Sequence, residues 1–123
     1  MADLRKIRWL AEPEAANYPA ALSYLLLVCE PKRAKALVKQ LGDEKVVQFK
    51  AKDIFRASGL SLLGVSNSHV QRDLRRIRAG KVLSPLLLVR VPEIAKVLVA
   101  DGYHRLCAVY SLDENAVVPC KIA

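Results

Sequence analysis

"VLVADGYHRLCAVY", residues 97–110, links two apolar runs through a short polar segment. The first run is short and apolar, which predicts a buried strand. Asp101-Gly102 then predicts a tight turn, because glycine adopts a positive φ without steric cost. The apolar residues that follow predict a helix over about 104–112. A strand, a turn and a helix are therefore expected in direct succession.

The rest of the chain is expected to alternate between helices and strands in a mixed order. Helices are predicted over 17–30, 31–43, 51–59 and 69–80, and strands over 45–49, 84–91, 95–100 and 116–123. Such an order predicts an α+β domain, with a small mixed sheet on which the helices pack.

Local signals predict how several helices begin, end and pack. The first helix is so rich in apolar residues that we expect it to be largely buried. Gly42, Gly59 and Gly80 are predicted to end three helices, and Ser66 or Ser68 to cap the last of these at its start. The predicted core stripes are Ala34, Leu37, Val38 and Leu41 in one helix and Val70, Leu74 and Ile77 in another.

Size and composition favour one folded domain over residues 1–123, without metal or disulfide support. No apolar stretch has the roughly 20 residues that span a bilayer, and the first residues lack the apolar core of a signal peptide. Three cysteines without paired spacing predict reduced, buried thiols in a cytoplasmic protein. No metal held by protein side chains and no membrane partner are expected.

The chain is strongly basic, with a formal net charge of +8. Such a balance indicates anionic partners: nucleotides, other phosphorylated small molecules, nucleic acid or an acidic protein. Charge alone does not distinguish among them, and solubility is the structural alternative.

Residues 101–105 combine several features of an anion site. The first amides of a helix have no intrahelical partner and carry partial positive charge, so phosphate groups bind there. His104 and Arg105 lie in the predicted first turn, and arginine offers a planar two-donor fork. A cation at this end opposes the helix dipole, which favours a functional role. In the structural alternative Asp101 caps the helix, Arg105 pairs with a carboxylate and His104 is a half-buried polar residue.

The segment Asp101-Gly102-Tyr103-His104-Arg105, with "VVPCKI" after it, resembles the signature of the ParB/sulfiredoxin-like superfamily. The resemblance covers about residues 66–123, and residues 1–65 form a helical N-terminal part outside it. It implies the small α+β fold of that superfamily, and the whole chain looks most like its small stand-alone ParB-like proteins.

The resemblance also implies a function for the box. In sulfiredoxin the corresponding His and Arg hold ATP phosphates, so His104 and Arg105 are the expected phosphate ligands, beside Asp101 and Gly102. Tyr103 stands where sulfiredoxin has its reactive Cys, so reduction of sulfinic acids is not expected. The free-serine kinases of the superfamily carry Asp-Gly-His-His-Arg, and ParB binds CTP. The implied cofactor is therefore ATP, ADP or CTP with Mg²⁺.

Residues 69–78 are expected to form a basic helix beside this box. Arg72, Arg75 and Arg76 share one face at helical spacing. Aligned with sulfiredoxin, His69, Arg72 and Arg76 fall where its nucleotide-binding helix contributes side chains. Three interpretations stay open: a phosphate pocket, possible phosphoryl transfer included; a DNA-binding ParB-like module without turnover; and a solvated arginine face. Whether the protein is an enzyme is not decided by its residues.

Overall fold

A four-stranded mixed sheet lies at the centre of the molecule. The computed structural model describes residues 6–64 and 66–123, so Val65 of the predicted loop lies outside the described part. The strand order is β2-β6-β4-β5, with β4 antiparallel to β5 and parallel to β6, and β2 antiparallel to β6. Their bounds are β2 Val47–Lys50, β4 Leu86–Val91, β5 Lys96–Asp101 and β6 Val117–Ile122.

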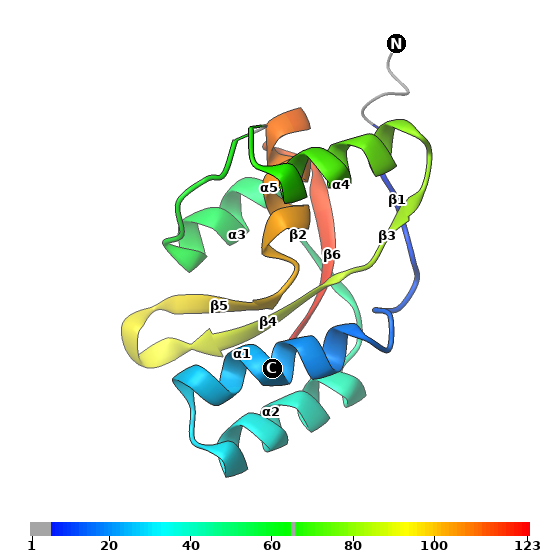
Figure 1. Cartoon of the computed structure of the whole chain (residues 1–123). Coiled ribbons are helices and arrows are strands. Elements are labelled where there is room, and N and C mark those ends of the chain that lie inside the picture. Colours follow the sequence, from blue (N-terminus) through cyan, green and yellow to red (C-terminus); the bar gives the residue numbers. More distant parts are fainter. Residues whose placement is uncertain (1–5, 65) are drawn as a thin grey trace.

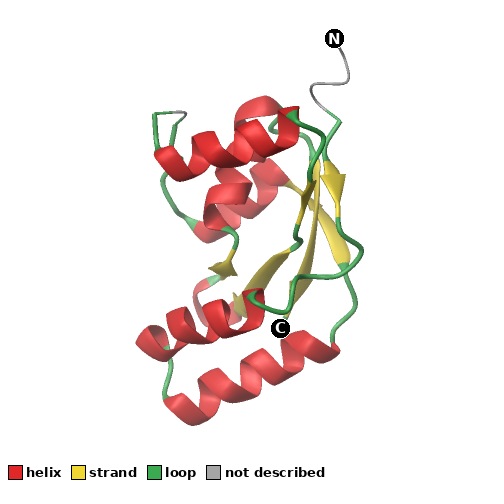
Figure 2. Ribbon diagram, turned by 45° about the vertical axis from the view of Figure 1, so that its right-hand side comes forward, coloured by secondary structure: helices red, strands yellow, loops and turns green. Residues whose placement is uncertain are grey.

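Five helices pack against this sheet in two groups (Figure 1). Their bounds are α1 Asn17–Val28, α2 Pro31–Asp43, α3 Ala51–Ser58, α4 Ser68–Arg78 and α5 Tyr103–Leu112. In Figure 2 the α1–α2 pair lies at the bottom, apart from the other three helices. The predicted α+β class is therefore correct.

Alternation along the strands builds a separate core on each face of the sheet. Leu86 and Leu88 of β4 face α3, α4 and α5, whereas Leu87 and Val89 face α1 and α2. All four of these side chains are buried. The sheet thus separates the two apolar cores on which the helix groups pack.

Two short elements complete the fold. β1 (Arg8–Trp9) pairs in parallel with β3 (Val82–Leu83), and the sequence pattern did not predict β1. A two-residue strand is too short to show a period. The turn between β4 and β5 is a 3₁₀ helix, η2 (Pro92–Ile94).

The prediction that the first helix is largely buried is wrong. Only Ala21 and Leu25 of α1 are buried, whereas Leu27 is 86% exposed. The helix packs on α2 and the sheet with one side, and its outer side faces solvent.

Two predicted helix boundaries are also wrong. Gly42 lies within α2, which ends at Asp43 without a left-handed residue, and Lys121 Nζ donates to the Gly42 carbonyl at 3.2 Å. The buried Lys121 side chain thus donates to a carbonyl at the end of α2. In helices that end with a left-handed glycine, backbone amides donate to such carbonyls instead. At the start of α4 the cap is Asn67, not Ser66 or Ser68, because its Oδ1 accepts from the amides of His69 and Val70. Gly59 ends α3 with a φ of 67°, as predicted.

Truncating a leucine in the α1–α2 core should destabilise the protein far more than truncating one on its surface. Leu87 is fully buried, so we expect Leu87→Ala to lower the free energy of unfolding by about 2–5 kcal/mol. The control Leu27→Ala removes the same atoms from an exposed site and should change it by less than about 0.5 kcal/mol. Urea unfolding followed by circular dichroism measures both, and equal effects would contradict the two-core arrangement.

Candidate anion-binding site

The turn between β5 and α5 requires glycine. Gly102 has a φ of 105°, a conformation that other residues rarely adopt. A Cβ at this position would lie 2.8 Å from Leu86 Cγ and 2.9 Å from Arg105 Nη2. The close approach of β4 and of the guanidinium therefore fixes both the residue type and the shape of the turn.

The first turn of α5 presents uncapped amides. Gly102 is the N-cap residue, its carbonyl accepts from the Leu106 amide, and no side chain among the described residues caps the helix. The amides of residues 103–105 have no acceptor within the helix, and they carry the positive end of its dipole. Asp101 is therefore not the N-cap, contrary to the structural alternative drawn from the sequence.

A pocket of about 360 Å³ opens at this turn. Residues 101–104 form one side of it, and Tyr24 of α1, Leu60 and Val99 of β5 contribute apolar surface. Neither Tyr24 nor Leu60 was singled out in the sequence, because both precede the segment that carries the resemblance. Apolar walls beside a polar helix end suit a ligand with one apolar and one anionic part.

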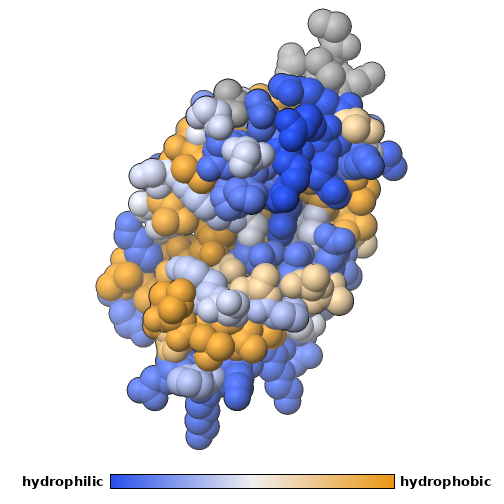
Figure 3. All heavy atoms as spheres, viewed as in Figure 1, coloured by the Kyte–Doolittle hydropathy of each residue, from blue (hydrophilic) through white to orange (hydrophobic). Residues whose placement is uncertain are grey.

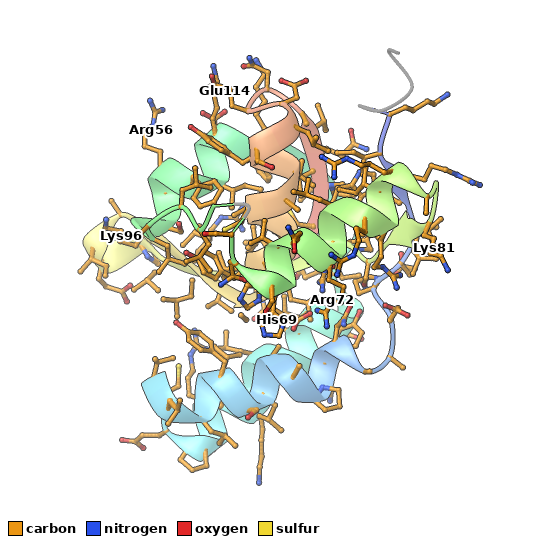
Figure 4. The ribbon with its side chains drawn as sticks, turned by 45° about the horizontal axis from the view of Figure 1, so that its top comes forward. Arg56, His69, Arg72, Lys81, Lys96 and Glu114 are labelled. Carbon is orange, nitrogen blue, oxygen red and sulfur yellow. The ribbon has the colours of Figure 1, made fainter. Side chains whose placement is uncertain are left out.

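His69 and His104 come together at the edge of this region. Their ring centroids are 4.7 Å apart, although 35 positions separate them in the chain. His69 and Arg72 lie on the side of α4 that faces α1 (Figure 4). The pKa of His104 is lowered by burial, and further by the nearby His69 and Arg72, while Asp73 acts in the opposite direction. His104 is therefore held mainly neutral at pH 7.

A second, polar pocket of about 290 Å³ is lined by Arg105 of α5 and by side chains of α4. It brings together Arg72, Arg76 and Arg105 with the carboxylates of Glu14 and Asp73. Arg76 also donates through Nη2 to the Val82 carbonyl at 3.2 Å. Arg72 and Arg76 of α4 therefore lie in the same pocket as Arg105 of the 101–105 segment.

Asp73 is a further residue of the site that the sequence analysis did not assign to it. It is only 5% exposed and lies on the same side of α4 as the core residues Val70, Leu74 and Ile77. An acid within the apolar stripe of a helix is a detectable signal, because a charge is seldom buried without a partner.

Arg105 contacts the protein's own oxygens. Its Nη2 pairs with Asp101 Oδ2 at 3.0 Å and donates to the Pro85 carbonyl at 3.4 Å, and its Nε donates to the Ser84 carbonyl at 2.9 Å. Both charged side chains are 17% exposed. The pairing that the sequence offered as the structural alternative for Arg105 is therefore present.

Tyr103 also has a partner within the protein. Its hydroxyl donates to the Ser61 carbonyl, which ties the segment after α3 to α5. Cys107, one turn further along α5, is buried, and burial raises the pKa of its thiol. Tyr103 lines the candidate pocket, and its hydroxyl is engaged by the Ser61 carbonyl.

No family model matches the chain, and neither does any curated protein or solved structure. None of the described helices is long and apolar enough to cross a membrane. Within residues 6–64 and 66–123, no three His, Cys, Asp or Glu side chains form a group suited to a metal ion.

Removing the Arg105 contacts should destabilise the fold. We expect Arg105→Gln to lower the free energy of unfolding by about 1.5–3 kcal/mol, because hydrogen bonds to a charged group are lost in a mostly buried position. A double-mutant cycle with Asp101→Asn should give a coupling of at least about 0.5 kcal/mol. Additive effects in urea unfolding would show that the two side chains do not act as a pair.

The titration of His104 should respond with opposite signs to its two neighbours. His69→Ala should raise the pKa of His104 by removing a like charge, and Asp73→Asn should lower it further. Because folding lowers the pKa of His104, protonation of His104 lowers the free energy of unfolding as the pH falls below about 6.5. Above that pH, His104 is neutral in both states and has no such effect. NMR titration of the ring protons measures the pKa, with Arg78→Gln as the control. A pKa at or above the ordinary histidine value in the parent protein would contradict this account.

Proposed function

We propose that the protein binds a nucleotide at the start of α5. The phosphates would lie against the amides of residues 103–105, beside His69, His104 and Arg72. The nucleoside would occupy the apolar pocket lined by Tyr24 and Leu60. The main support is the uncapped first turn of α5, which opens into a pocket with apolar walls, while Arg72 and Arg76 line a second pocket next to it.

The electrostatics favour an anion with several charges. Amides at a helix start and arginine side chains both donate to phosphate oxygens. Arg72 and Arg76 line the polar pocket without a described ion pair, whereas the guanidinium of Arg105 is paired with Asp101. Phosphate binding would therefore depend chiefly on the amides, His104 and the α4 arginines, and Arg105 would position the turn.

The resemblance of residues 101–105 to the ParB/sulfiredoxin-like box supports the same proposal. In that box a His and an Arg hold nucleotide phosphates, and here His104 keeps the corresponding place. ATP, ADP and CTP, with Mg²⁺ on their phosphates, are the ligands to test first. Phosphoryl transfer is a second step of this proposal: a neutral His104 would accept the proton of the substrate hydroxyl that receives the phosphoryl group.

A DNA-binding surface is the second candidate function, and one observation favours it. Figure 3 shows a hydrophilic area over α4 in its upper part, above an apolar area over α1. Four arginines of α4 are exposed: Arg72, Arg75, Arg76 and Arg78. Such a surface would bind phosphates of either a free nucleotide or a duplex.

Nucleotides should raise the melting temperature of the protein, and variants of the site should remove the effect. A ligand at 100 times its Kd adds about 2.7 kcal/mol to stability, which corresponds to several degrees at this chain length. His104→Asn and Arg72→Gln should each weaken binding by about tenfold. The matched control is Arg75→Gln, which removes the same charge from the same helix at a residue that contacts Gln71 instead.

Two outcomes would contradict nucleotide binding. One is no shift with ATP, ADP, CTP or GTP, with or without Mg²⁺. The other is an equal loss in the Arg75→Gln control, which would indicate a diffuse charge effect. Duplex affinity would instead support the DNA-binding candidate if its logarithm fell with that of the salt concentration with a slope near −0.9 per neutralised phosphate.

A further inference from the structure

A separate pocket of about 250 Å³ lies between α3 and the sheet. Its roof is Asp53, Ile54 and Ala57 of α3, and its floor comes from all four strands of the main sheet. The floor residues are Phe49, Leu88, Arg90, Val97 and Ile122. None of these residues belongs to the site at the start of α5.

The pocket is apolar inside and carries one charge of each sign. Leu88, Ile54 and Ile122 are buried, so its interior is a preformed apolar surface. Asp53 lies on the roof and Arg90 on the floor, and no ion pair joins them in the described parts of the chain. An acidic and a basic residue, both exposed, thus contribute to opposite walls of the same small pocket.

Asp53 is only weakly engaged by its own helix. Its carboxylate lies 3.9 Å from Arg56 Nη2, and the Arg56 side chain is 88% exposed and points away from the molecule (Figure 4). An exposed pair at this distance contributes little, so it does not compete strongly with a ligand.

We propose that this pocket binds a free apolar α-amino acid. Its side chain would enter the apolar interior, its carboxylate would pair with Arg90 and its ammonium with Asp53. The volume lies below the roughly 300–1,000 Å³ of pockets for drug-sized ligands, which suits a molecule of this size.

The presence of one acidic and one basic residue at the pocket favours a zwitterion over an apolar carboxylic acid or an apolar amine. An apolar carboxylic acid would satisfy Arg90 and bring a second negative charge toward Asp53. An apolar amine would do the reverse. Only a ligand with both charges next to one apolar group matches roof, floor and interior together.

The experiment is calorimetric titration of the intact protein with leucine, methionine and phenylalanine. We expect saturable binding of at least one of them. For the amino acid that binds, its amide, which lacks the carboxylate, and its N-acetyl derivative, which lacks the ammonium, should each bind at least about tenfold more weakly than the parent. Asp53→Asn and Arg90→Gln should produce similar losses, and Arg56→Gln should not.

Each remaining outcome would overturn the proposal. It fails if none of the three amino acids binds, if the amide or the N-acetyl derivative binds as well as the parent amino acid, if either Asp53→Asn or Arg90→Gln leaves binding unchanged, or if Arg56→Gln weakens it equally. His104→Asn separates the two sites, because it should weaken nucleotide binding and leave amino-acid binding unchanged. Loss of nucleotide binding in every assay would therefore leave this proposal standing.

Discussion

The contacts of Arg105 hold together the part of the molecule on which the candidate anion site depends. One guanidinium joins the end of β5, through Asp101, to the segment that leads into β4, through the Ser84 and Pro85 carbonyls. It also approaches the place where a Cβ of residue 102 would lie. Glycine, arginine and aspartate are therefore required together. A cation in the first turn opposes the helix dipole, and the carboxylate four residues earlier compensates for it.

The net charge of +8 does not show which basic side chains are available to anions. Arg105 is neutralised by Asp101, and Lys121, only 3% exposed, pairs with Glu12 at 2.9 Å. These two cations support the fold. In the described part of the chain, the basic side chains without such a pair include arginines of α4. Of these, Arg72 lies with His69 near the turn between β5 and α5. The position of the charges, more than their sum, favours a site at that junction.

The sequence predicted most features that depend on neighbouring residues, the Asn67 cap excepted, and missed those that depend on distant ones. The Gly59 helix end follows from its own conformation, and the core stripe of α4 follows from spacing. The end of α2 depends on Lys121, which is 79 positions away from Gly42, so no local pattern showed it. The exposure of α1 depends on which elements cover it. For the candidate site, the sequence analysis singled out the 101–105 segment and residues of α4. It did not single out Tyr24 and Leu60, because only the folded chain brings them to the pocket at the start of α5.

The two candidate pockets have no described lining residue in common, although both are bounded by β5 and by the end of α3. Val97 lines the pocket under α3 and Val99 lines the pocket at α5, so both lie on the same face of β5. Ala57 and Leu60 stand on either side of the Gly59 turn in the same way. The end of α3 therefore separates the pockets, and its left-handed glycine directs Leu60 toward one while Ala57 stays over the other. A change at Gly59 would disturb both pockets at once, whereas Asp53 and His104 each belong to one.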